Sequence, residues 1–62
     1  MDSTPAHRLM AGQRVRIEGP GVVTGVEFDE VGETVDVLWR PDGQQKVLRA
    51  TLPDGHPVKH AD

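Results

Sequence analysis

The sequence predicts an all-β fold, a small barrel of five short strands. Short segments alternate apolar and polar residues, as strands with one buried face do. Clusters of glycine, proline and aspartate separate these segments at roughly regular spacing. The sequence shows neither a long helical pattern nor an internal repeat. A chain of 62 residues is therefore expected to form a single domain built from strands and tight turns.

Five segments are assigned as strands from the alternation of their side chains. They span residues 13–18, 22–28, 34–40, 44–48 and 56–58. The side chains expected to fill the core are Val15, Ile17, Val22, Val26, Phe28, Val35, Val37, Trp39, Val47 and Leu52. At about 1.5 to 3 kcal/mol for each large side chain that is fully buried, this core offsets the entropy of the chain only narrowly.

Glycine and proline residues are expected to shape the barrel between these strands. Residues 19–21 read Gly-Pro-Gly and predict a turn, because glycine permits positive φ and proline cannot donate to a ladder. Gly25 lies inside the second strand, where the missing side chain allows a bulge or a sharp bend. Residues 41–43 read Pro-Asp-Gly, a strong turn signature. A single 3₁₀ turn at residues 49–52, before the last strand, is expected to bring Leu52 into the core.

Both ends of the chain lack a sustained period. We expect residues 1–11 to form a flexible N-terminal tail and residues 59–62 a C-terminal tail, which leaves residues 12–58 as the barrel. No apolar run approaches the roughly 20 residues of a membrane span, and the first ten residues lack the pattern of a signal peptide. The absence of cysteine fits a reducing compartment. These features predict a soluble, cytoplasmic protein.

The composition argues against catalysis and against strong binding of nucleic acid. Seven Lys and Arg against ten Asp and Glu give a net charge of −3, whereas contacts to phosphate supply much of the affinity for nucleic acid. The chain has no cysteine, and no serine falls at a predicted strand end where a nucleophile could be held. Neither the histidines nor the acidic residues have the spacing of a metal site. We therefore expect no enzyme activity, no metal and no cofactor.

The candidate binding residues are a set of basic side chains and one tryptophan. They are Arg14, Arg16, Trp39, Arg40, Lys46 and Arg49. Arg14 and Arg16 share the outward face of the first strand, so a modest cationic patch is expected on that flank. An ordinary solvated charged surface is the alternative interpretation. Trp39 is assigned to the core with its rim near the surface, because two aromatic residues cannot serve both as core and as a ligand cage.

Four segments together resemble the SH3-like barrels of the KOW and Tudor-like group. They read GQRVRI, GPGVVTGVE, VDVLWRPDG and KVLRATL. The matching positions are Gly12 with Val15, Gly21 with Val23, residues 35–43, and Val47 with Leu52. Pro41 is an extra residue before the Asp-Gly turn. The resemblance covers residue 12 to about residue 58, and it implies an architecture shared by proteins with unrelated tasks.

Relatives of this shape include domains that interact with RNA polymerase and Tudor-like domains appended to helicases. The resemblance therefore implies a non-enzymatic module that docks on a protein partner of the transcription or DNA-processing machinery, such as RNA polymerase or a helicase. An incompletely closed barrel also leaves a strand edge that can accept a strand from a partner, and we expect docking through such an edge together with the basic flank of Arg14 and Arg16.

Two alternatives remain open at this point. One is a barrel that binds nucleic acid weakly and in a salt-sensitive manner. The other is an oligomeric reductase resembling type B dihydrofolate reductase. The pore motif of that enzyme, Val-Gln-Ile-Tyr, has no match in this chain, where the corresponding residues 45–48 read Gln-Lys-Val-Leu.

Overall fold

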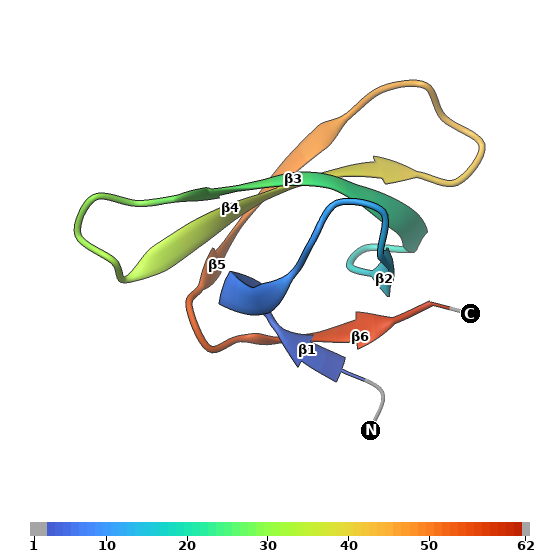
Figure 1. Ribbon diagram of the computed structural model, residues 1–62. Helices are drawn as coiled ribbons and strands as arrows, with labels where there is room; N and C mark the ends of the chain where they lie inside the picture. Colours follow the sequence, from blue (N-terminus) through green and yellow to red (C-terminus); the bar gives the residue numbers. More distant parts are fainter. Residues whose placement is uncertain (1–2, 62) are drawn as a thin grey trace.

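A computed structural model describes residues 3–61 and shows an all-β protein (Figure 1). Six antiparallel strands form one sheet in the order β1-β6-β2-β3-β4-β5. The elements are β1 (Ser3–Pro5), the 3₁₀ turn η1 (Ala6–Arg8), β2 (Arg14–Arg16), β3 (Pro20–Phe28), β4 (Thr34–Pro41), β5 (Leu48–Pro53) and β6 (Pro57–His60). Over residues 3–61 the sheet does not close, because β1 and β5 each pair on one side only. No helix in this part of the chain has the length and hydropathy to cross a membrane.

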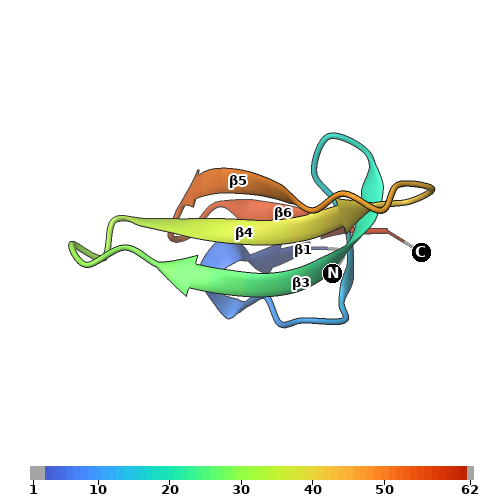
Figure 2. The ribbon, with the colours of Figure 1, turned by 90° about the horizontal axis from the view of Figure 1, so that it is seen from above.

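The sheet curls so that its two ends form separate layers. Strands β3, β4 and β5 lie side by side, and β1 and β6 lie beneath them (Figure 2). The long strand β3 belongs to both layers, since Pro20, Gly21 and Val22 pair with β2 and the stretch from Gly21 to Phe28 pairs with β4. The register of the second pairing shifts between Val23 and Gly25. The irregularity predicted at Gly25 is thus confirmed.

The core lies between these layers and is made mainly of valine. Its buried side chains are Ala6, Leu9, Val15, Val23, Val35, Val37, Trp39 and Val58, with Ile17, Val26, Leu48, Ala50 and Leu52 packed against them. Seven of the ten expected core residues therefore belong to the core or pack on it: Val15, Ile17, Val26, Val35, Val37, Trp39 and Leu52.

The assignment of three residues to the core is wrong, and each error has a local cause. The residues are Val22, Phe28 and Val47. The bulge after Val23 changes the phase of β3, so Val23 fills the position assigned to Val22. Phe28 is 65% exposed because it ends β3, beside the hairpin loop. Val47 is 47% exposed because it precedes β5.

The fourth predicted strand is wrong, whereas a strand is present where the fifth was predicted. Residues 44–47 form a loop, and the strand occupies Leu48–Pro53, so both the predicted strand at residues 44–48 and the 3₁₀ turn at residues 49–52 are wrong. Half-buried and exposed residues alternate along β5, but the small side chain of Ala50 at an inward position conceals the alternation in the sequence. The last strand exists as Pro57–His60, and the fold has six strands where five were expected.

Residues 3–5 of the segment expected to form a flexible N-terminal tail are part of the sheet. β1 pairs with β6, and η1 follows it with Ala6 fully buried. The N–H of Ala6 donates to the carbonyl of His56 at 2.9 Å, and the N–H of His7 donates to that of Asp54 at 3.1 Å. At the other end β6 continues to His60, within the expected C-terminal tail; residues 1, 2 and 62 lie outside the described range.

Two strands approach each other closely at Gly21. A Cβ atom at Gly21 would stand 2.6 Å from Cε3 of Trp39 and 2.7 Å from the carbonyl oxygen of Arg40. Both distances are shorter than van der Waals contact, so only glycine fits beneath the tryptophan ring. This packing leaves Trp39 only 3% exposed. At Gly25, by contrast, an added Cβ would meet only Cδ1 of Leu38, at 3.7 Å.

We predict that Gly21→Ala lowers the free energy of unfolding by about 1–3 kcal/mol, because the methyl group overpacks the ring of Trp39. Gly25→Ala is the matched control, since its methyl group has room and the free energy of unfolding should stay the same or rise by up to about 1 kcal/mol. Urea unfolding followed by the fluorescence of the single tryptophan measures both. Equal stability of the two variants would contradict this account of the core.

Candidate functional site

Strand β5 forms a free edge of the sheet. It pairs with β4 from Thr34↔Pro53 to Trp39↔Leu48, and no strand within residues 3–61 lies on its other side. The N–H of Asp54 donates to the carbonyl of Glu33 at 3.2 Å, which makes these two a hydrogen-bonded pair. Hydrogen-bonded and non-bonded pairs alternate in an antiparallel ladder. The N–H and C=O groups of Arg49 and Thr51 therefore point away from β4, toward the open edge.

The hydrogen bonds between β4 and β3 support this orientation of the β5 backbone. The N–H of Asp29 donates to the carbonyl of Thr34 at 3.2 Å, so alternate residues from Thr34 onward face β3 and the intervening residues face β5. By the same alternation Pro53 also directs its backbone to the open edge. A proline is tolerated there because the N–H that it lacks has no ladder partner.

A groove runs beside β5 on the inner side of the sheet. Its main part has a volume of about 410 Å³ and is lined by Ile17, Glu18, Trp39, Leu48, Arg49, Ala50, Thr51 and Leu52. A hollow of about 270 Å³ adjoins it and shares Trp39 and Leu48. A smaller hollow of about 70 Å³ shares Ile17 and Leu52. The groove thus follows the free edge from Leu48 to Leu52, with aliphatic side chains along it.

Three of the six predicted binding residues lie at this groove: Arg16, Trp39 and Arg49. Trp39 is core, as expected, and contributes only its rim to the lining. Arg16 is exposed and borders the smaller hollow. Lys59 of the neighbouring strand β6 is paired with Arg16. Sequence patterns could not identify Lys59, because its position depends on the pairing of β6 with β2.

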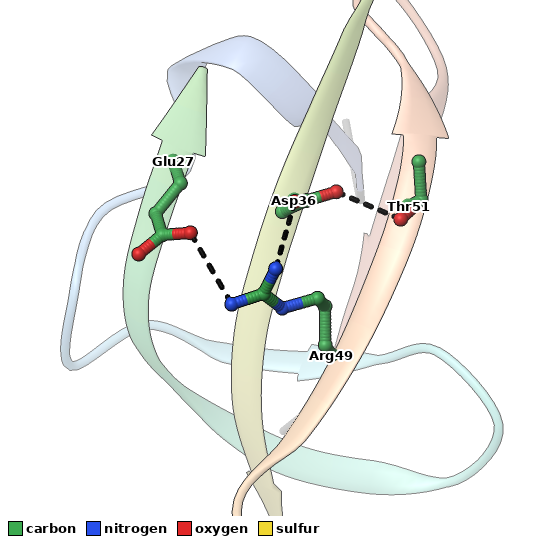
Figure 3. Close-up of polar contacts among 4 residues, drawn as sticks. All are labelled: Glu27, Asp36, Arg49 and Thr51. Atoms are coloured by element: carbon green, nitrogen blue, oxygen red, sulfur yellow. Dashed lines mark hydrogen bonds and ion pairs between the residues drawn. The ribbon is translucent and has the colours of Figure 1, made fainter. Parts of the chain in front are cut away.

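Arg49 is held on the outer face of the sheet by two carboxylates (Figure 3). Its guanidinium lies 3.4 Å from Oε1 of Glu27 and 3.3 Å from Oδ2 of Asp36. The hydroxyl of Thr51 donates to the other oxygen of Asp36 at 2.7 Å. Glu27, Asp36 and Thr51 occupy one row across β3, β4 and β5. Each exposed ion pair contributes only about 0–1 kcal/mol, so the cluster chiefly orients Arg49.

Arg14 lies on the same exposed face of β2 as Arg16, as predicted, but it is engaged with Asp42. Its two terminal nitrogens donate to the two carboxylate oxygens at 3.0 and 2.7 Å. The hydrogen bond from Arg14 is the main cause that lowers the pKa of Asp42; desolvation opposes it, and the charges of Arg14 and Arg40 reinforce it. The pair ties β2 to the turn that follows β4.

The structure does not gather the six predicted binding residues into one patch. Arg40 donates to the carbonyl of Gln44 at 3.4 Å, and Lys46 stands exposed in the loop before β5. Neither lines the groove. The inner residues of β5, above all Ala50, were missed by sequence reasoning, although the alternation from Leu48 to Leu52 carries a weak signal for them.

Comparisons with protein-family models, curated proteins and solved structures gave no significant match to this chain. Across residues 3–61, no three His, Cys, Asp or Glu side chains gather in a way that could hold a metal ion. A role is therefore inferred from the geometry of the free edge and its groove.

The pairing of Arg14 with Asp42 predicts a defined dependence on pH. The pKa of Asp42 in the folded protein lies below its ordinary value of 3.8. The pair therefore stabilises the fold fully above about pH 4, and this contribution is lost as the pH falls through the lowered pKa. Asp42→Asn should lower the urea midpoint at pH 7, and the gap to the wild type should close in acid. A gap that persists at pH 2 would contradict the assignment.

Proposed function

We propose that the protein is a non-enzymatic binding module that receives an extended segment of a protein partner as an added strand on β5. The observation that carries this proposal is the edge of β5, whose backbone groups at Arg49 and Thr51 face outward beside an aliphatic groove. In strand addition, backbone hydrogen bonds supply affinity, and pockets for alternate side chains supply specificity. The edge provides the backbone groups, and the groove provides the space for side chains.

The proposed partner segment is extended and carries aliphatic side chains at every second position. Once paired with β5, it directs those side chains toward Leu48, Ala50 and Leu52, which face the groove. Its intervening side chains lie on the outer face beside Arg49 and Thr51. Arg16 and Lys59 stand near one end of the groove and favour an acidic residue at that end of the segment.

The distribution of charge favours a protein over nucleic acid as the partner. Two of the six predicted binding residues, Arg14 and Arg49, are engaged with carboxylates. The chain as a whole carries a net charge of −3. Phosphate contacts need cations that carboxylates do not already neutralise. Strand addition needs none of them, since it relies on the backbone.

The SH3-like architecture is part of the same proposal. Strands β2 to β5 carry the segments that resemble the KOW and Tudor-like group, and their sheet is curled and left open at β5. On that resemblance, the partner belongs to the transcription or DNA-processing machinery.

The proposal predicts that Thr51→Pro abolishes capture of the partner. The substitution removes an N–H that faces the open edge and leaves the ladder to β4 intact, because the N–H of Thr51 does not bond to β4. Thr51→Val is the matched control, since it also loses the hydroxyl bond to Asp36 but keeps the N–H. Affinity capture from a lysate of the source organism, read by mass spectrometry, should recover one protein with the wild type and Thr51→Val, and at least tenfold less with Thr51→Pro.

Equal recovery with both variants would overturn the proposal. Fluorescence of buried Trp39 verifies that each variant is folded. If Thr51→Pro does not fold, Arg49→Pro removes the neighbouring outward N–H and serves in its place. A short DNA duplex added to the lysate distinguishes a direct contact from one bridged by nucleic acid, because only a bridged partner would be lost.

A further inference from the structure

We propose that the free edge of β5 also pairs with β5 of a second copy, which gives a two-fold symmetric dimer with one continuous sheet. This inference rests on the same open edge as the proposed function, and it names a second occupant for it. The dimer would cover the edge that a partner strand needs. The second copy and the partner would then compete for β5.

The positions of charge and proline select one register for antiparallel pairing of two copies. Pairing Arg49 with Arg49 places like charges opposite each other, which is unfavourable. Pairing Thr51 with Thr51 places Arg49 opposite Pro53, which has no N–H to give to the carbonyl of Arg49. With Ala50 on the two-fold axis, Arg49 faces Thr51 of the second copy. Both residues then present an N–H and a C=O, and each such pair exchanges two hydrogen bonds.

The same register matches apolar side chains on the groove side. Ala50 meets Ala50 at the axis, and Leu48 meets Leu52 of the second copy. These three residues of β5 line the groove of about 410 Å³, which has room for the side chains of an added strand. The register centred on Thr51 would instead bring Leu48 opposite Asp54. The apolar face therefore favours the axis at Ala50 independently of the hydrogen bonds.

Charged side chains on the outer face do not oppose each other across the edge in this register. In each copy Glu27 and Asp36 share the single guanidinium of Arg49, so the cluster keeps a net negative charge. Arg49 of the second copy would lie opposite Thr51 and extend the row that Glu27, Asp36 and Thr51 form. Its guanidinium lies on Glu27 and Asp36 of its own copy, toward β4 and away from the shared edge. No like charges therefore face each other across the edge in the register that the inner face also selects.

The dimer is expected to be weak and to depend on concentration. Only Leu48–Pro53 forms the edge, and interfaces of this kind that bury less than about 1,200 Å² are transient. A weak dimer keeps the edge strand from pairing indiscriminately with other chains, and it still releases β5 to a partner with higher affinity.

A single introduced cysteine tests the register, because the chain has none of its own. Ala50→Cys places two thiols at the axis, in a pair without mutual hydrogen bonds whose Cα atoms lie about 4.5 Å apart in antiparallel strands. That separation lies within the disulfide range of about 4.4–6.8 Å. In a glutathione redox buffer we expect Ala50→Cys to form a covalent dimer. Leu48→Cys and Leu52→Cys should each form several-fold less alone, and their equimolar mixture should recover the higher yield.

Sedimentation of the unmodified protein tests the association itself. The wild type and Thr51→Val should show a monomer–dimer equilibrium, and Thr51→Pro should remain monomeric at the same concentrations. The fluorescence of Trp39 again verifies folding, and Arg49→Pro is the second variant. A wild type that stays monomeric at every soluble concentration would overturn the proposal, as would equal yields from the three single-cysteine variants.

These outcomes separate the dimer from the proposed function. A monomeric wild type that still loses its partner on Thr51→Pro overturns the dimer alone. A dimer in the expected register whose capture of a partner is unaffected by Thr51→Pro overturns the proposed function alone.

Discussion

The packing of the Trp39 ring on the backbone of Gly21 is the constraint on which the rest of the fold depends. Gly21 lies where β3 passes from its pairing with β2 to its pairing with β4, and a Cβ there would collide with the ring. Without that side chain the two layers approach closely enough to bury the only tryptophan. The ring opposes Leu48 across the β4–β5 ladder, so the position of β5 follows from the same contact. Its rim then becomes part of the groove.

A core made mostly of valine explains why the sheet stays open at β5. A domain of this size buries only about 60% of the surface of its unfolded chain, so each large side chain matters. Ala50 presents little volume on the inner face of β5, and Leu48 and Leu52 are only half buried. The groove of about 410 Å³ is what remains between these residues and Ile17. An added strand would supply the apolar surface that the chain itself lacks.

Local chemistry made the middle of the fold predictable. Val35, Val37 and Trp39 alternate without interruption, and the Pro-Asp-Gly turn ends that strand with Gly43 at φ +80°. The features that sequence reasoning missed depend on distant segments. The sequence of β1 has no strand pattern, and this strand forms because it pairs with β6. The pattern of β5 was obscured by the small side chain of Ala50. At the candidate site, the exposed face of β2 was foreseen, but the engagement of Arg14 with Asp42 arises from residues 28 positions apart.

Hydrogen exchange along β5 tests the open edge most directly. At a concentration where sedimentation shows only monomer, the amides of Ala50 and Leu52 bond to β4 and should exchange slowly, whereas those of Arg49 and Thr51 face solvent and should exchange much faster. Such an alternation along one strand requires a partner on one side and none on the other. Slow exchange at all four positions in the monomer would contradict a free edge at β5. The binding site proposed there would then not exist.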